Sequence, residues 1–500
     1  MKFKELCSLL EKNHFEARVY LPCDVKDKDP EIDVLVSDSR VVTHGTMFAC
    51  VSGGHADGHD FAAGAVDAGA CALMCERELP LPVPQIICSD IRRNMGVAAS
   101  LLYGTPLEKL TMVALTGTNG KTTSTFMLKS ILEASGTKTG LLGTVFYDDG
   151  DVVEEAVHTT PEGSDLQFWL SRMVKNGCKA CIMETSSHSV SQGRIDGVLY
   201  DRAGFTNLSV DHLDFHGDME NYFQAKRTLF TKYMRNGWKC AVNIDDEYGK
   251  RLFSELKEHA VSYGIEDKNA DFSASIKGVS IKGLDAEIKT PCSDAPVAVR
   301  LPLLGKYNVY NALQALSLAW TLGVKIETAI DSLVNMKQVP GRLERYHIAG
   351  SGSCVIDFAH SPDGLEKVLT ALRPVCRGRL CVVFGAGGDR DKTKRPLMGE
   401  IAGRLADMAI ITSDNPRSED PAVITLEIEA GAKKHDTEYK IIVDRREAIY
   451  AGLSAIAPED ILLIAGRGPE RCQILKDGPV PLLDKDVVLD WCAQNGKEVL

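Results

Sequence analysis

Short apolar runs alternate with polar loops and amphipathic stretches along most of the chain, most clearly after residue 340. There, four apolar runs each belong to a repeated pattern of strand, polar loop and helix, and they predict strands at 381–385, 408–412, 440–444 and 460–466. Strands that alternate with helices build mostly parallel sheets covered by helices. Ligands of such sheets collect at the carboxyl ends of the strands. The pattern therefore predicts an α/β fold with binding sites at those ends.

Local loop signals divide the chain into three regions. The first ends at YGTP (103–106), the second opens with the strand-like LTMVALTG (110–117), and VPGR (339–342) breaks the helix that precedes the third. A chain of 500 residues suits about three domains. We predict domains at 1–105, 106–338 and 339–500.

Composition and charge narrow the class of protein. The chain is 44% hydrophobic and 25% charged, as ordinary globular proteins are, and its formal net charge is −12. That charge argues against nucleic acid or an anionic membrane as the main partner. The first 15 residues predict a charged amphipathic helix rather than a signal peptide, and no apolar run approaches the length of a membrane span. We predict a cytoplasmic protein with no membrane span.

The cysteines do not indicate a disulfide framework. There are 15 of them, an odd number with irregular spacing, and most lie in apolar runs, which predicts reduced thiols. Cys178 and Cys181 form a single CxxC pair with no second pair nearby, and the pair leads into an apolar strand. This context favours buried thiols over a zinc or redox site.

The stretch TGTNGKTT (116–123) follows a predicted strand and opens a helix. Glycines allow backbone N–H groups to wrap a phosphate at the positive end of a helix. Lys121 would then reach the β- and γ-phosphates, and the Thr122 hydroxyl would bind Mg²⁺. The full phosphate-loop pattern needs glycine at position 115, where this chain has Leu115, so an ordinary glycine-rich turn stays open as the alternative. The predicted nucleotide-binding residues are Gly117, Thr118, Asn119, Gly120, Lys121, Thr122 and Thr123.

A second group of polar residues follows downstream. Glu184 ends an apolar stretch, and residues 205–230 include Asp211, His212, Asp214, His216 and Lys226. Glu184 and His212 near a triphosphate could hold Mg²⁺ together with waters. Spacing alone leaves the alternative equally open, in which DHLDFH is a polar loop and Lys226 an ordinary surface residue of a helix.

These stretches occur in the order found in the Mur ligases, together with ETSSH (184–188), GKYNVYNALQA (305–315), PGRLER (340–345) and VIDFAHSPDGLEKVL (355–369). The chain resembles that family from DSRVVTHGTMF (38–48) to AGRGPE (465–470), and within it the members that add the third amino acid of the peptide. The resemblance implies a uridine-binding first domain, a P-loop ATPase second domain and a Rossmann-like third domain.

The resemblance also implies an activity. The enzyme would use ATP to join meso-diaminopimelate to UDP-N-acetylmuramoyl-L-alanyl-D-glutamate through an acyl phosphate, in the synthesis of peptidoglycan precursors. Its partners would be these small molecules, and we predict a monomer. Folylpolyglutamate synthetases are similar, but they lack the uridine-binding domain. A P-loop regulator without ligase activity is a further alternative, and it predicts the loss of Glu184, His212 or Lys226, all of which are present.

Residue roles follow from the same resemblance. Lys226 would take up CO₂ to become a carbamate and bind a second Mg²⁺ with His212, while Thr122 and Glu184 hold the first. The implied catalytic residues are Lys121, Glu184, His212 and Lys226. Asn311 and Arg342 match positions that contact the nucleotide. The positions that match the UDP-muramoyl-dipeptide site are Ser37, Ser39, Gly54, His55, Ala56, Thr159, Thr160, Ser186, Gln192 and Arg194.

The stretch TSDNPRSEDP (412–421) bears on the choice of amino acid. In the family, Asp-Asn-Pro-Arg at this place accompanies meso-diaminopimelate, and other sequences accompany L-lysine, which stays the alternative substrate. Diaminopimelate has a second carboxylate that lysine lacks, and a guanidinium can bind it in a bidentate fork. The implied amino-acid site comprises Arg390, Asp414, Asn415, Pro416, Arg417, Gly466 and Glu470.

One departure from the family pattern lies in this site. The family usually has Gly-Lys-Gly-His-Glu where this chain has Gly-Arg-Gly-Pro-Glu at 466–470. Pro469 lacks an N–H group and has a fixed φ, so the shape of the loop that carries Glu470 stays open.

Overall fold

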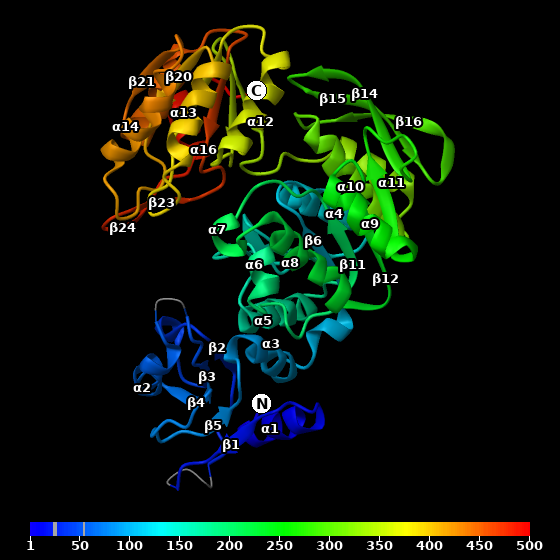
Figure 1. Ribbon diagram of the computed structural model, residues 1–500, viewed down its shortest axis with the longest axis vertical. Coiled ribbons are helices and arrows are strands. Elements are labelled where there is room, and N and C mark those ends of the chain that lie inside the picture. Colours follow the sequence, from blue (N-terminus) through cyan, green and yellow to red (C-terminus); the bar gives the residue numbers. More distant parts are fainter. Residues whose placement is uncertain (24–27, 54–55) are drawn as a thin grey trace. The chain divides into compact units, whose positions relative to one another are not determined.

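The computed structural model describes residues 1–23, 28–53 and 56–500 (Figure 1). The chain forms two compact units, residues 1–273 with 311–332, and residues 274–310 with 333–500. The predicted boundaries near residues 105 and 338 stay a prediction. Among the helices in the described part of the chain, none combines the length and apolar character that a membrane span needs.

The first unit begins with a five-stranded sheet in the order β1-β5-β4-β3-β2. Its strands are parallel except β1, which pairs antiparallel with β5. Apolar side chains of both sheet faces are buried, with α1 and α3 contributing to one of the two core clusters and α2 to the other. The elements are α1 (Phe3–Lys12), β1 (Arg18–Tyr20), β2 (Val34–Val36), β3 (Thr46–Ala49), α2 (Ala62–Asp67), β4 (Ala70–Cys75), β5 (Gln85–Ile87) and α3 (Ile91–Leu102).

A larger sheet follows in the same unit, with β12, β11, β6, β10 and β7 side by side and parallel. β13 continues it in parallel, and β8 and β9 extend the other edge antiparallel. The elements are β6 (Thr111–Thr116), α4 (Lys121–Ala134), β7 (Thr139–Leu142), β8 (Phe146–Asp148), β9 (Val153–Glu155), α5 (Gly163–Lys175), β10 (Ala180–Glu184), α6 (Ser187–Ser191), β11 (Tyr200–Phe205), α7 (Leu213–His216), α8 (Met219–Lys232), β12 (Met234–Asn243), α9 (Glu247–Leu256) and β13 (Ala260–Gly264).

Four further elements lie where the chain passes between the two units: β14 (Phe272–Ser280), β15 (Gly283–Thr290), β16 (Ser293–Leu301) and α10 (Tyr307–Thr321). β15 and β16 form an antiparallel pair. The next helix, α11 (Ile326–Val334), precedes the strands of the third sheet.

The second unit contains a six-stranded sheet in the order β17-β18-β22-β19-β20-β21, parallel except for β17. Alternate residues of its strands face opposite sides, so Val382 and Phe384 pack with α12, α13 and α14, while Cys381 and Val383 pack with α15 and α16. Its elements are β17 (Glu344–Ile348), β18 (Gly352–Asp357), α12 (Pro362–Leu372), β19 (Leu380–Phe384), α13 (Lys394–Leu405), β20 (Met408–Ile411), α14 (Pro421–Ala432), β21 (Glu438–Ile441), α15 (Arg445–Ala455), β22 (Ile461–Ala465), β23 (Cys472–Leu475), β24 (Gly478–Pro481) and α16 (Asp484–Gln494).

The predicted α/β class with mostly parallel sheets is confirmed, and the four predicted strands correspond to β19, β20, β21 and β22. The strand predicted at 440–444 starts two residues and ends three residues later than β21 (Glu438–Ile441). Val443 belongs to the loop after the strand, where its carbonyl accepts hydrogen bonds from Ser413 N (3.1 Å) and Thr412 Oγ1 (3.2 Å). The cysteines are all free, as predicted.

Candidate active site

The phosphate loop lies between β6 and α4, and its glycines allow backbone conformations and contacts that other residues resist. Gly117 has a φ of +142° and Gly120 a φ of +90°. A Cβ on Gly117 would lie 1.8 Å from Thr206 Oγ1. The loop is held by Asn207, which accepts hydrogen bonds from Thr118 N (2.8 Å) and, through its side chain, from Asn119 N (3.1 Å). The loop thus leads directly into a helix N-terminus, which attracts anions.

Lys121 and Lys226 meet at this loop. Lys121 Nζ donates hydrogen bonds to the carbonyls of Gly117 (2.8 Å) and Thr118 (3.0 Å), and Lys226 Nζ donates to the same Gly117 carbonyl (2.9 Å). Lys226 is only 1% exposed, and its ammonium lies 4.6 Å from the centre of the Tyr222 ring. The alternative of a surface lysine is therefore wrong.

The buried environment changes the chemistry of Lys226. Burial, and after it the charge of Lys121, lower the pKa of the Lys226 amine well below its ordinary range, while Asp211 acts in the opposite direction. A lowered pKa favours the neutral amine over the ammonium form. The neutral amine is the form that can act as a nucleophile.

Glu184 is the carboxylate at the end of β10, and it is surrounded by hydroxyl groups. Its side chain accepts hydrogen bonds from Thr122 Oγ1 (3.0 Å), Thr144 Oγ1 (3.0 Å) and Thr144 N (2.9 Å), and the residue is 1% exposed. Carboxylate and hydroxyl oxygens are hard ligands of the kind that Mg²⁺ prefers. In the described residues, no three His, Cys, Asp or Glu side chains form a metal-binding group by themselves. The donors of this site therefore fit an Mg²⁺ that keeps several waters.

The sequence did not reveal Thr144. It follows β7, which is the neighbour of β10 in the sheet, and its hydroxyl lies 3.1 Å from that of Thr159. The ends of neighbouring parallel strands converge, so a correct strand order would have placed Thr144 beside Glu184.

His212 directly precedes the short helix α7, as its N-cap residue, and has a φ of +54°. Its ring makes an edge contact with His188, with 4.8 Å between the centroids, and the stacked pair of His216 and Tyr222 lies close by. Partial burial lowers the pKa of His212, and Lys121 and Lys226 act in the same direction, against Asp211. A neutral imidazole is the form that ligates metals.

The residues expected to bind the UDP-muramoyl-dipeptide fall into two groups. Thr160, Ser186 and Arg194 lie together, because Ser186 N and Arg194 Nη1 both donate to Thr160, at 3.1 and 3.4 Å. Thr159 directly precedes Thr160 and contacts Thr144, and Gln192 lies in the turn after α6. The other group belongs to the N-terminal sheet region, with Ser37 and Ser39 half-buried and Ala56 exposed. Gly54 and His55 lie outside the described residues.

Glu162 and Arg92 were missed by the sequence reading. Glu162 lies between Arg194 Nε (3.0 Å) and Arg92 Nη1 (2.9 Å), and it fixes the Arg194 guanidinium. No local pattern connects Arg92 with Glu162, which are 70 residues apart.

The two residues expected at the nucleotide lie in different units. Asn311 lies beside the phosphate loop, since its Oδ1 accepts a hydrogen bond from Ser124 Oγ (3.4 Å) and would lie 2.4 Å from a Cβ on Gly120. Arg342 belongs to the second unit, where its guanidinium lies 4.8 Å from the centre of the Phe358 ring.

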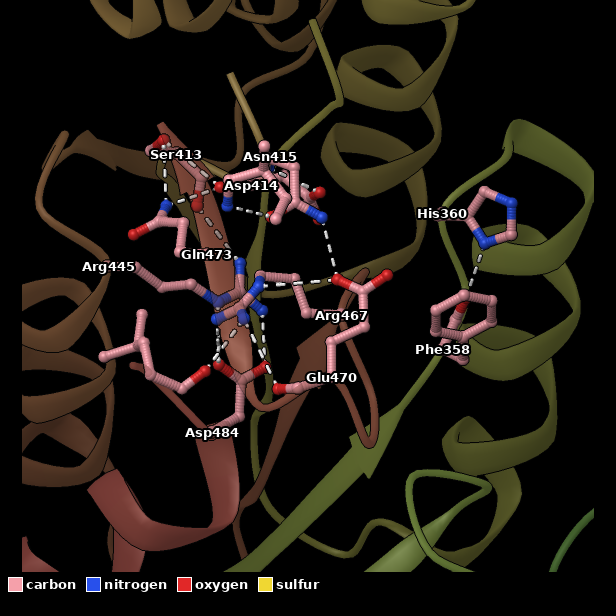
Figure 2. Close-up of polar contacts among 12 residues, drawn as sticks. Phe358, His360, Ser413, Asp414, Asn415, Arg445, Arg467, Glu470, Gln473 and Asp484 are labelled. Atoms are coloured by element: carbon pink, nitrogen blue, oxygen red, sulfur yellow. Dashed lines mark hydrogen bonds and ion pairs between the residues drawn. The ribbon is translucent and has the colours of Figure 1, made fainter. Parts of the chain in front are cut away.

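The expected amino-acid site lies at the carboxyl ends of β20 and β22 (Figure 2). Asn415, in the loop after β20, binds the segment that follows β22. Its Nδ2 donates a hydrogen bond to Glu470 Oε2 (2.7 Å), and its Oδ1 accepts one from Ile474 N (2.9 Å). Asp414 is 7% exposed, and its Oδ2 has no hydrogen-bond partner among the described residues. Gly466 lies directly against that oxygen, which would be 2.4 Å from a Cβ. A buried carboxylate oxygen without a donor suits a cationic ligand.

The expected amino-acid site contains both acidic and basic side chains. Partial burial and the charge of Asp414 raise the pKa of Glu470, while the hydrogen bond from Asn415 opposes the shift. Burial, and after it the charge of Arg390, lower the pKa of Arg417. The site therefore offers two carboxylates and two guanidiniums, a set that matches the ammonium and carboxylate groups of an amino acid.

Buried residues surround the segment 466–470, where this chain departs from the family pattern (Figure 2). The sequence did not indicate that they form one group. Arg445 makes two hydrogen bonds to Asp484, at 2.8 and 2.7 Å, and donates to the carbonyl of Ala465 (3.1 Å). Arg467 is fully buried and donates to the carbonyl of Leu482 (2.8 Å). Pro469 packs against Gly341, with its Cδ 2.4 Å from the position of a Cβ there. The loop still directs Glu470 toward Asn415.

Comparison with known families matches three models in order along the chain. They are the Mur ligase family, catalytic domain (residues 31–99), the Mur ligase middle domain (115–319) and the Mur ligase, glutamate ligase domain (341–468).

Curated relatives match nearly end to end. A UDP-N-acetylmuramoyl-L-alanyl-D-glutamate–2,6-diaminopimelate ligase of Clostridium acetobutylicum is 42% identical over 93% of this chain and 95% of its own. Its namesake in Geobacillus thermodenitrificans is 41% identical over 92% of this chain and 94% of its own.

Solved structures agree in fold. A structure of a UDP-N-acetylmuramoyl-L-alanyl-D-glutamate–2,6-diaminopimelate ligase is 29% identical, covers 99% of both chains and has a TM-score of 0.65. The MurF ligase of Thermotoga maritima in complex with ADP, 20% identical over 93% of this chain and 98% of its own, shares the fold with a TM-score of 0.66. The resemblance predicted from the sequence is thereby confirmed: this chain belongs to the Mur ligase family.

Proposed function

We propose that the protein joins meso-diaminopimelate to UDP-N-acetylmuramoyl-L-alanyl-D-glutamate at the expense of ATP, releasing ADP and phosphate. The reaction belongs to the synthesis of peptidoglycan precursors. The proposal rests on the cluster of charged side chains at the ends of β20 and β22, where Arg417 accompanies Asp414 and Glu470, with Arg390 on the loop after β19. Relatives with about 40% identity are named for the same reaction.

The chemistry requires an activated carboxylate, because oxide is a poor leaving group. Transfer of the γ-phosphoryl group of ATP to the substrate carboxylate gives an acyl phosphate, which the amine of the amino acid attacks with release of phosphate. Phosphoryl transfer depends mainly on positioning and on neutralising charge. The phosphate loop and the N-terminus of α4 position the phosphates, and Lys121 neutralises part of their charge.

The metal-binding residues we assign are Thr122 and Glu184 for one Mg²⁺ and His212 with carbamylated Lys226 for a second. Mg²⁺ bound there would neutralise the phosphate oxygens and the incoming carboxylate. The burial of Lys226 supports the assignment, since a neutral amine is what CO₂ requires. The carbamate predicts a carbonyl resonance from the purified protein in ¹³C-bicarbonate, which the Lys226→Ala variant lacks.

The same charged side chains explain how the protein would select its amino acid. Arg417 is partly buried and is repelled by the charge of Arg390, so a ligand with a second carboxylate compensates for both the burial and the repulsion. Lysine has no second carboxylate to pair with the Arg417 guanidinium, whose Nη1 donates to the carbonyl of Gly388 (2.7 Å), and the loss of this charge pairing discriminates between the two amino acids. L-Lysine is therefore the alternative that a direct assay has to exclude.

The test incubates the protein with ATP, Mg²⁺, UDP-N-acetylmuramoyl-L-alanyl-D-glutamate and meso-diaminopimelate, and identifies the tripeptide product by mass. We expect stoichiometric product and phosphate. Phosphate release without a tripeptide would overturn the proposal in favour of a nucleotide-hydrolysing regulator. The monomeric state and the cytoplasmic location stay predictions.

A further inference from the structure

Two loops carry the arginines that we assign to the carboxylates of the amino acid. The loop between β19 and α13 carries Arg390, and the loop between β20 and α14 carries Arg417. The charge of Arg390 contributes to lowering the pKa of Arg417, which means that the two guanidiniums repel each other. Other contacts must therefore hold the two loops at a fixed separation.

The residues next to the two arginines bind each other. Asp389 has a φ of +53°, and its carboxylate accepts hydrogen bonds from Ser418 Oγ (2.6 Å) and Ser418 N (3.1 Å). Its own N–H donates to Glu419 Oε1 (2.6 Å). Each loop thus supplies both donors and acceptors to the other.

A buried ion pair strengthens this junction. Arg395 is 0% exposed, and its guanidinium donates to both carboxylate oxygens of Glu419, at 2.8 and 3.0 Å, and to the carbonyl of Gly387 (3.3 Å). Lys392 Nζ lies 3.1 Å from Glu419 as well. These contacts, led by the hydrogen bonds from Arg395, lower the pKa of Glu419 to about 2. Glu419 is therefore ionised and bound to the Arg390 loop through backbone and side chains.

Asp420, the acidic residue that follows Glu419, makes different contacts. Asp420 accepts a hydrogen bond from Ala422 N (2.9 Å) and caps helix α14. Of the acidic residues that follow Arg417, Glu419 is thus the one directed at the other loop.

We propose that Glu419, acting through Arg395 and the N–H of Asp389, is a positioning residue that sets the separation of Arg390 and Arg417. By this means it sets the preference for an amino acid with two carboxylates. The inference rests on the proposed function, because the two arginines matter only if they bind the amino acid. A bidentate arginine contact depends on geometry, so a small displacement of either loop weakens it.

The test compares Glu419→Gln with a matched control, Glu427→Gln. Glu427 binds the same Arg395 Nη1 (2.6 Å), but it lies on helix α14 rather than in either loop. We expect Glu419→Gln to raise KM for meso-diaminopimelate at least about fivefold and to lower the preference for meso-diaminopimelate over L-lysine by the same factor. KM for ATP and for the UDP-linked substrate, and all constants of Glu427→Gln, should stay within about twofold of the wild type.

Two outcomes would overturn the proposal. One is an unchanged KM for meso-diaminopimelate in folded Glu419→Gln protein, and the other is an equal rise of all three KM values, as a general loss of structure would cause. Ser418→Ala removes only the hydroxyl contact to Asp389, and we expect a smaller rise in the same KM, about twofold to threefold. It serves as the test if Glu419→Gln fails to fold, and an unchanged KM would then contradict the proposal. Failure of the proposed function is seen separately, in wild-type protein that makes no tripeptide.

Discussion

The phosphate-loop site and the proposed amino-acid site position their functional groups in two different ways. In the first, glycines with positive φ values and a helix N-terminus form the site within TGTNGKTT, so the local backbone supplies most of the binding groups. In the second, charged side chains from elements far apart in the sequence bind one another, as Arg395 does with Glu419 and Arg445 with Asp484. Variants of the first site should therefore abolish the chemistry, and variants of the second should change stability and the choice of amino acid.

The largest expected effect concerns the phosphate-loop site. Lys226→Ala should lower kcat for tripeptide formation at least about 1,000-fold, because it would remove the carbamate that we propose as a ligand of the second Mg²⁺. Steady-state kinetics with saturating substrates measure the loss. Lys232→Ala, on the same helix but about half exposed, is the control and should stay within about twofold. Comparable activity of Lys226→Ala and wild type would remove Lys226 from the mechanism.

The second prediction concerns the ion pairs under the amino-acid pocket. Asp484→Asn leaves Arg445 buried without its anion, and we expect it to cost about 3–5 kcal/mol of folding free energy. Urea unfolding followed by circular dichroism measures this loss. Asp490→Asn breaks the exposed pair with Arg446 and should cost less than about 1 kcal/mol. Equal losses in the two variants would show that burial of the first pair is unimportant.

The third prediction tests whether a change in the proposed amino-acid site affects meso-diaminopimelate without affecting ATP. Arg417→Ala should lower kcat/KM for meso-diaminopimelate about 100-fold, because a bidentate contact to a carboxylate is lost. The value for L-lysine and KM for ATP should change little. Arg404→Ala, in which an exposed pair with Glu366 is broken, is the control. A parallel fall for both amino acids would mean that Arg417 does not read the second carboxylate.

Much of the phosphate-loop site could be predicted from the sequence, but much less of the proposed amino-acid site could be. Gly117, Lys121 and Thr122 lie within one short stretch, whose spacing alone indicates a phosphate loop. Asp414 and Asn415 were found through the family resemblance. Their contact with Glu470, 55 residues away for Asn415, depends on β20 and β22 ending at the same edge of the sheet.

The supporting residues carried no local signal. Arg445 and Arg467 look like surface arginines in the sequence, yet both are fully buried. Asp484 binds the guanidinium of Arg445, and the carbonyl of Leu482 accepts a hydrogen bond from Arg467. Thr144 and Glu162 are similar cases in the first unit, since their partners become neighbours only once the strands are ordered. Pairings between distant loops require the tertiary structure, whereas strands and a phosphate loop require only local pattern.

The smallest expected effect is a pH dependence of the amino-acid pocket. The pKa of Glu470 is raised, so on acidification it takes up a proton at a higher pH than an ordinary glutamate does and loses its attraction for an ammonium group. KM for meso-diaminopimelate should therefore rise as the pH falls from neutrality toward the ordinary range of a glutamate, and it should rise by a larger factor than KM for ATP. An equal rise of both constants would place the titrating group elsewhere. Initial rates at matched ionic strength provide the measurement.

The central claim is that the second unit selects an amino acid with two carboxylates for a reaction that the phosphate loop drives. The most direct test is the ratio of kcat/KM for meso-diaminopimelate to that for L-lysine, measured with the wild-type protein, ATP, Mg²⁺ and the UDP-linked dipeptide. We predict a ratio of at least about 100, since only the first ligand pairs with Arg417. A ratio near one, or a preference for L-lysine, would contradict the claim.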